Sequence, residues 1–306
     1  MNVKEFKDYL EQNWEKVKNS PRTERVIEDA EETEVLVLLP AICVGEKDCT
    51  IPYRIVAVGK REEGEIKVEH VGVISSEYEL ITHKDAIREV ENSLIERGYK
   101  TKVVFAKDVG ADLRALVVSN KLINGNKRVA VLIENSYKAS SALKHYLYLV
   151  EKDEDKTTLI PVVPLWRRKH VKGSWTKEEW ETVEKLIAEL PHLFERMGKI
   201  RVKLSKSAFE SLLKGLKTTY YRKKDEGKYE KVVFPIGEEI YKEMVGDLGD
   251  TPTIYEAYIY LCEKIGEKRQ GLTLQAKRKL EKGLLRLMQT IRKRLNAGII
   301  PQVIEL

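Results

Sequence analysis

Cysteine, histidine and closely spaced glycines are scarce in this sequence of 306 residues, and their scarcity excludes several kinds of site. The 3 Cys form no CxxC pair, which excludes a disulfide framework or a Cys-rich zinc site and favours a reducing compartment, the cytoplasm. The 5 His are scattered with no i, i+3 or i, i+4 pair, so no metal site is expected. There is no glycine-rich phosphate loop and no GxSxG elbow. No catalytic residue, cofactor or metal ion is therefore expected.

Long hydrophobic runs are also missing. No stretch reaches the roughly 18 apolar residues that a membrane-spanning helix requires, and residues 1–14 predict an amphipathic helix rather than a signal peptide. The sequence therefore predicts a protein that is neither secreted nor embedded in a membrane.

What the chain has in abundance is charge. Charged residues make up 34% of it and hydrophobic residues 42%, with a net charge of +6 and a pI near 8.9. The richness in Lys, Arg and Glu is typical of thermophile proteins, and the positive balance favours anionic partners. The length favours two domains.

The first half predicts short strands and a few helices. Apolar spacing predicts a helix over 3–18, and Val-, Ile- and Leu-rich strands follow between residues 34 and 75, with a hairpin tip at 59–65. A helix is expected from His83 to Gly98, with Thr82 as its N-cap and Gly98 as its stop.

A run of strands follows that helix, and a turn at Asn124-Gly125-Asn126 has strong hairpin chemistry. The strands are expected at 99–108, 113–121, 127–136, 142–151 and 157–165. Successive strands with tight turns predict an α+β fold, a mostly antiparallel sheet with helices packed on one face, followed by a largely helical C-terminal region. The predicted domains are an α+β core at 1–165 and a basic helical domain at 166–306, with the boundary between 165 and 200.

The second half predicts mainly helices. The expected elements are a helix from Lys177 to Gly198 interrupted near Pro191, a strand at 200–204, and helices near 205–218, 236–246, 253–268 and 273–296. In the last helix an apolar stripe is expected to be buried, with the cations, Lys282 among them, on the other flank. The stripe consists of Leu280, Leu284, Leu287, Met288, Ile291 and Leu295.

Three clusters of basic residues, two of them mixed with aromatics, are the strongest functional signal. Lys and Arg neutralise phosphates, and aromatic rings stack on unpaired bases. The candidate nucleic-acid contacts fall into these three clusters. The first is Trp166, Arg167, Arg168 and Lys169, the second is Tyr221, Arg222, Lys223 and Lys224, and the third is Lys277, Arg278 and Lys282. A solvated helix face of the thermophile type is the alternative explanation for each cluster.

Two other functions stay open. Glu65, Lys67 and Glu69 alternate on one strand and would suit a divalent-metal nuclease, although such alternation is also that of an ordinary solvated strand face. A self-assembling or protein-binding factor without nucleic-acid affinity is the other alternative.

The segment from Val71 to Ser141 resembles the phage- and plasmid-associated proteins that carry domain of unknown function 932. Their order of strand, helix, strand, hairpin and Asn-Ser turn occurs here as VGVISSEYELITHKDAIREVENSLIERGYKTKVV, RALVVSN and VLIENSYKASSALKHYLYLVE. The segment DTPTIYEAYIYLCEKI (250–265) is a second similarity. KDEDKTTLIPVVPLWRRKH replaces the segment with Arg and Cys-Asn that follows in the family.

The resemblance implies a virus, plasmid or integrated element and no assigned active site. Together with the basic clusters, it leads to the hypothesis of a nucleic-acid-binding protein, with DNA favoured over RNA and single-stranded DNA binding or annealing as the activity. A homo-oligomer, as a ring or filament, and no membrane partner are expected.

Overall fold

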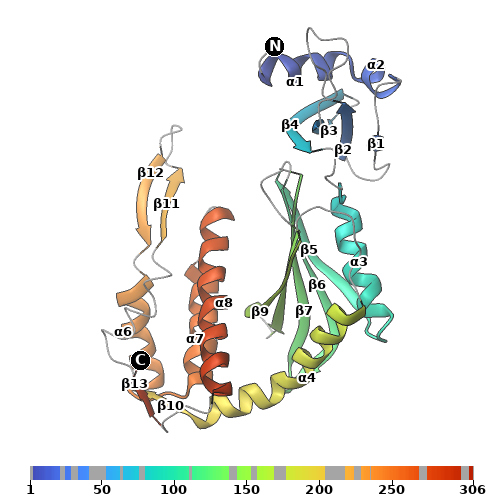
Figure 1. Ribbon diagram of the computed structural model, residues 1–306. Coiled ribbons are helices and arrows are strands. Elements are labelled where there is room, and N and C mark those ends of the chain that lie inside the picture. The colour runs from blue at the N-terminus through green and yellow to red at the C-terminus, as the bar shows by residue number, and fades with distance from the viewer. Residues whose placement is uncertain are drawn as a thin grey trace. The chain divides into compact units, whose positions relative to one another are not determined.

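The computed structural model divides into two compact units by the density of its contacts. It describes residues 3–20, 25–28, 34–40, 53–62, 65–75, 80–109, 112–137, 143–152, 157–168, 177–203, 218–223, 229–234, 236–268, 274–297 and 303–305 (Figure 1). The first unit holds residues 1–117, 132–145 and 166–175, and the second holds residues 118–131, 146–165 and 176–306. The expected domain boundary between 165 and 200 stays a prediction.

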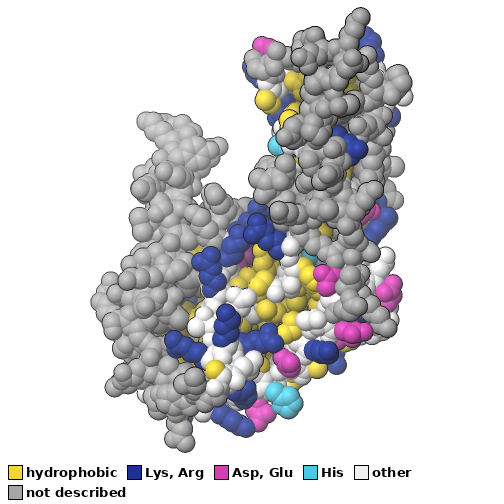
Figure 2. Space-filling model, in the orientation of Figure 1, with side chains coloured by type: hydrophobic (Ala, Val, Ile, Leu, Met, Phe, Trp, Pro, Cys, Tyr) yellow, Lys and Arg dark blue, Asp and Glu magenta, His cyan; other side chains and the backbone are white. Residues whose placement is uncertain are grey.

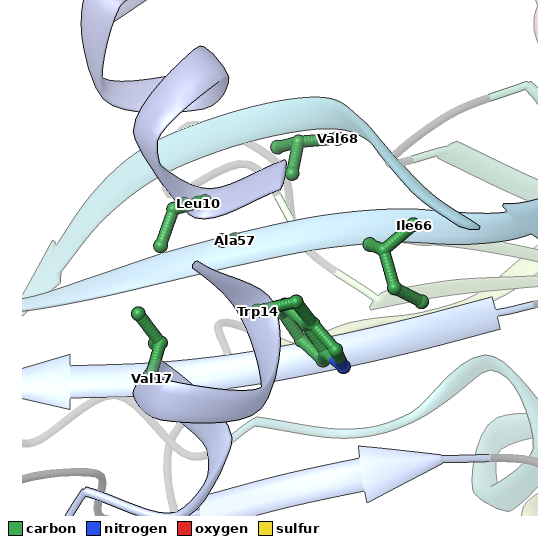
Figure 3. Close-up of a cluster of buried hydrophobic side chains, with 6 residues drawn as sticks. All are labelled: Leu10, Trp14, Val17, Ala57, Ile66 and Val68. Atoms are coloured by element: carbon green, nitrogen blue, oxygen red, sulfur yellow. The ribbon is translucent and has the colours of Figure 1, made fainter. Parts of the chain in front are cut away.

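The first unit begins with two short helices and a four-stranded antiparallel sheet. The elements are α1 (Val3–Gln12), α2 (Trp14–Lys18), β1 (Arg25–Glu28), β2 (Glu34–Pro40), β3 (Tyr53–Glu62) and β4 (Glu65–Ser75), with the strands in the order β1-β2-β3-β4. The helix predicted over 3–18 is present, with a turn at Asn13 between its two parts. Leu10, Trp14 and Val17 pack on one face of the sheet (Figure 3). The apolar side of the N-terminal helices thus packs against residues of β3 and β4.

Helix α3 (His83–Ile95) begins at the predicted residue, and a turn over residues 96–98 follows it up to the predicted stop at Gly98. The Thr82 hydroxyl oxygen accepts a hydrogen bond from the Asp85 amide at 3.0 Å, which satisfies one of the amides that a helix leaves unpaired at its start. Gly98 adopts φ +80°, the left-handed conformation that ends helices. Ala86, Val90 and Leu94 are buried along one side of α3.

A five-stranded antiparallel sheet forms the centre of the chain, as predicted. Its strands follow one another in sequence order as β5 (Thr101–Val109), β6 (Asp112–Ile123), β7 (Lys127–Ser136), β8 (Leu143–Lys152) and β9 (Thr157–Arg168). Asn124 at φ 46° and Gly125 at φ 91° make the β6–β7 turn, and positive φ at both positions is the signature of a type I′ hairpin. The residues of β7 and β8 are almost all buried.

The C-terminal region is largely helical, and most of its predicted helices are present. They are α4 (Lys177–Lys199), α6 (Ile236–Leu248), α7 (Ile254–Lys268) and α8 (Leu274–Asn296). The helix predicted near 205–218 lies outside the described residues, except for Thr218, which begins a strand. Within the described residues, no helix is long and apolar enough to cross a lipid bilayer.

The predicted interruption of α4 near Pro191 is wrong, because the helix continues through that residue. Proline removes one backbone hydrogen bond, at a cost of about 3 kcal/mol inside a helix. Leu193, Phe194 and Met197, which follow it, are all buried. Burial of these three side chains offsets the local cost and keeps the last turns helical.

Two small sheets lie in the second unit, and the pairing of their strands was not predicted. Strand β10 (Arg201–Lys203) pairs in parallel with β13 (Val303–Glu305), and β11 (Thr218–Lys223) forms an antiparallel hairpin with β12 (Tyr229–Phe234). The predicted strand at 200–204 corresponds to β10. One of the predicted basic clusters lies partly on β11.

Candidate nucleic-acid interface

Helix α8 concentrates positive charge on its solvent side. Its sequence holds eight Lys and Arg and a single acid, Glu281. The predicted apolar stripe is confirmed at Leu280, Leu284, Met288 and Leu295, all buried. Glu281 is also buried, at 6% exposure, so α8 presents no exposed carboxylate to balance its exposed cations.

Three exposed cations lie on the side of α8 opposite this stripe, and we call Lys282, Arg286 and Lys293 the α8 ridge. Steps of four and seven residues return to the same side of a helix with 3.6 residues per turn. At about 1.5 Å per residue, the ridge is about 16 Å long. Figure 2 shows Lys and Arg side chains gathered over this helix. In the described part of the chain, the ridge residues form no ion pair.

The other helices of the second unit contain more acidic than basic residues. Acids outnumber bases in α4 by six to four, in α6 by four to one and in α7 by three to two. A general excess of charged residues would place both signs on every solvated helix face. The segregation of positive charge onto α8 therefore favours a surface that attracts anions.

The structure describes the side chains of two of the three predicted contacts on α8. Lys282 belongs to the ridge, whereas Arg278 is half-buried, with its Nε atom buried and the residue engaged inside the protein. Lys277 is described only by its backbone in the first turn. Arg286 and Lys293 were missed as contacts, although their spacing from the apolar stripe was a signal that could have found them.

A second basic cluster lies on a neighbouring element. Strand β11 contains three of its predicted residues, which pair across the hairpin as Tyr221 with Lys231, Arg222 with Glu230 and Lys223 with Tyr229. Lys224 lies outside the described residues. Helix α8 contacts β11, so the fold brings the second and third clusters together on adjacent elements of one unit.

The first cluster lies at the end of β9, in the first unit. The half-buried Trp166 ring stands edge-on to the buried His145 ring, with a centroid distance of 6.4 Å and an interplanar angle of 85°. Arg167 is exposed, Arg168 is described only by its backbone, and Lys169 lies outside the described residues. Part of the Trp166 surface is thus used in the packing of the protein itself.

The residues of the nuclease alternative lie on the polar side of β4. Glu65 and Lys67 are exposed and Glu69 is half-buried, while Ile66 and Val68 between them are buried. This alternation is that of a strand with one solvated face. Among the described residues, no group of three His, Cys, Asp or Glu side chains is placed to hold a metal ion.

A buried polar group at the start of α3 was not predicted. The His83 ring stacks on the Tyr137 ring at 4.1 Å and 14°, and the His83 amide donates to the Tyr137 hydroxyl at 2.9 Å. The Asn135 side-chain amide donates to the Ile81 carbonyl at 2.9 Å and lies 3.1 Å from His83 Nδ1. Thr82, as predicted, makes the cap of the helix. His83 joins α3 to the end of β7.

The described surface thus holds one exposed cationic ridge that is segregated from acids, next to a strand with a second basic cluster. Comparison with family models, with curated proteins and with solved structures finds no match for this chain.

Proposed function

We propose that this protein binds single-stranded nucleic acid, with DNA as the expected partner, and that the α8 ridge contacts the phosphates. The observation that carries the proposal is the segregation of charge, because α8 buries its only acid and exposes Lys282, Arg286 and Lys293. Cations aligned along a helix neutralise neighbouring phosphates and release their counterions. Such contacts are independent of base sequence.

The neighbouring hairpin supports a preference for single strands. Strand β11 carries Tyr220 and Tyr221 in its sequence beside two basic residues, and it contacts α8. Aromatic rings stack on unpaired bases for about 1–3 kcal/mol per base. Annealing of complementary strands, by an oligomer encoded on a mobile element, is the activity that the resemblance described above adds to this proposal.

The test removes the ridge charges together. The triple variant Lys282→Ala, Arg286→Ala, Lys293→Ala changes exposed positions opposite the core and is expected to fold as the wild type does. A plot of log affinity against log salt has a negative slope. On single strands each lost phosphate contact makes this slope less steep by about 0.7, so the loss of three contacts makes it less steep by about 2. Fluorescence anisotropy of a labelled oligonucleotide over a series of salt concentrations measures both the affinity and the slope.

A matched control removes the same net charge elsewhere. Lys16, Lys102 and Lys121 are exposed and lie outside α8, and their triple replacement by Ala is expected to leave the slope within about 0.5 of the wild-type value. Equal losses in the two triple variants would mean that net charge, and not the ridge, governs binding. An unchanged slope in the ridge variant would remove α8 from the interface.

A further inference from the structure

A small cavity lies in the second unit between β9, α4 and the C-terminal end of α8. Its volume is about 160 Å³. Val162 and Val163 of β9 and Leu190 of α4, all buried, line it together with the half-buried Leu186. Apolar side chains thus line one part of the cavity, and the polar residues Glu189, His192, Arg196, Arg292 and Asn296 line the rest.

The size of the cavity limits what can enter it. An engineered protein cavity of about 150 Å³ with an apolar lining accepts one benzene molecule. A volume near 160 Å³ thus suits a single six-membered ring. A pyrimidine base has such a ring, whereas the fused rings of a purine need more room.

Two arginines border the cavity and are held in place by the protein. Arg292 donates to the Glu189 carboxylate at 2.9 Å, and Arg196 donates to the Leu295 carbonyl and to the Asn296 side chain. A guanidinium carries five N–H donors, so these bonds leave donors for a ligand. Fixed cations beside an apolar slot match a ligand with a flat ring and a negative charge next to it.

The cavity lies near the C-terminal end of the α8 ridge. Arg292 immediately precedes Lys293, the last residue of the ridge. A strand whose phosphates follow the ridge to Lys293 therefore comes within one residue of Arg292, which borders the cavity.

We propose that this cavity accepts one pyrimidine base of the bound single strand, while Arg196 and Arg292 contact the adjacent phosphate. The inference rests on the proposed function and names the base class that the same interface prefers. It predicts a preference for pyrimidine strands in addition to the phosphate contacts and the base stacking of the proposed interface, neither of which selects a base.

The first experiment compares three labelled oligonucleotides of equal length with the wild-type protein: oligo-dT, oligo-dA and an abasic strand. We expect oligo-dT to bind about tenfold more tightly than oligo-dA, and the abasic strand to bind least because it also loses the stacking on β11. Equal binding of oligo-dT and oligo-dA would overturn the inference and leave the proposed function intact. Failure to bind any of them would contradict the proposed function itself.

The second experiment fills the cavity. Leu186→Trp, at a half-buried position of the lining, is expected to abolish the preference for oligo-dT and to leave binding of the abasic strand unchanged. Ala188→Trp adds the same side chain at an exposed position of α4, and its preference is expected to match that of the wild type. Retention of the oligo-dT preference in a folded Leu186→Trp variant would overturn the assignment of the cavity.

A third measurement does not depend on any variant. A single 5-iodouracil in an oligo-dT strand, irradiated with the wild-type protein, is expected to crosslink to peptides that contain Leu186 to Arg196 or Arg292. Crosslinks confined to other peptides would contradict the site. Millimolar free thymidine monophosphate is expected to compete weakly, because it lacks the ridge contacts, and strong competition would show that the cavity binds the free nucleotide instead.

Discussion

Replacing Lys127 by methionine tests how the central sheet is joined to the C-terminal helices. Lys127 Nζ lies 2.8 Å from the Glu151 carboxylate, with side-chain exposures of 8% and 18%, and 5.9 Å from the centroid of the Tyr255 ring. Lys127→Met keeps the aliphatic length but leaves Glu151 as a largely buried charge without its cation. Removing one partner of a fully buried pair costs about 3–5 kcal/mol. Because water still reaches Glu151, we expect a loss of about 2–3 kcal/mol at pH 7.

Urea unfolding followed by circular dichroism measures this loss as a lower midpoint at unchanged slope. The double variant Lys127→Met, Glu151→Gln removes both charges and is expected to recover more than half of the stability. A single variant that loses less than about 0.5 kcal/mol, or a double variant as unstable as the single one, would refute the role of the pair.

The pair also predicts a dependence on alkaline pH. Burial lowers the pKa of Lys127, but the hydrogen bonds and charge interactions with Glu151 and Tyr255 outweigh burial and raise that pKa above its usual 10.5. A folded-state pKa above the unfolded one means that the contribution is fully present below pH 10.5 and is lost as the pH rises through the raised value. The stability difference between wild type and Lys127→Met should therefore shrink above pH 10.5.

Three further predictions concern a buried hydroxyl, a helix cap and a buried thiol. Tyr258→Phe removes the buried hydroxyl that donates to the Pro161 carbonyl at 2.5 Å, and we expect a loss of about 1–2 kcal/mol in thermal or urea unfolding; no loss would mean that water replaces the bond. Thr82→Ala removes the cap of α3 and should cost about 1 kcal/mol, whereas Thr82→Ser should cost less than half of that. Cys262 is buried, and burial raises the pKa of its thiol, so we expect a thiol reagent at pH 8 to react with it only after unfolding. Mass spectrometry of the labelled peptides checks this, and rapid labelling of Cys262 in the native protein would contradict its burial.

Local chemistry explains why much of the fold could be predicted. Thr82 and Gly98 fix the two ends of α3, and Asn124-Gly125 fixes the central hairpin, through backbone preferences that do not depend on distant residues. The apolar spacing of α8 likewise predicted both its length and its buried side. Elements of this kind carry their own signals within a few residues.

The missed features depend on residues that are far apart in the sequence. Strand β10 pairs with β13 about a hundred residues later along the chain, and His83 meets Tyr137 across 54 residues. The β11–β12 hairpin had a local signal in its Thr, Tyr and Val residues. Its basic residues were instead interpreted only as candidate nucleic-acid contacts.

The candidate interface was predicted in part. The sequence identified α8 as basic and placed Lys282 on its exposed side, but only the fold shows that Glu281 is buried and that Arg278 is half-buried and engaged. The contact between α8 and β11 could be found only from the tertiary structure, because nothing in the sequence of either segment indicates that it packs against the other.

The most direct test of the account is the binding of wild-type protein to a fluorescein-labelled single strand and to a duplex of the same length, measured by anisotropy from 50 to 400 mM salt. The account predicts tighter binding of the single strand and an affinity that falls steeply as the salt concentration rises. Absence of binding to both at the lowest salt concentration, or binding of both that does not change with salt, would contradict it.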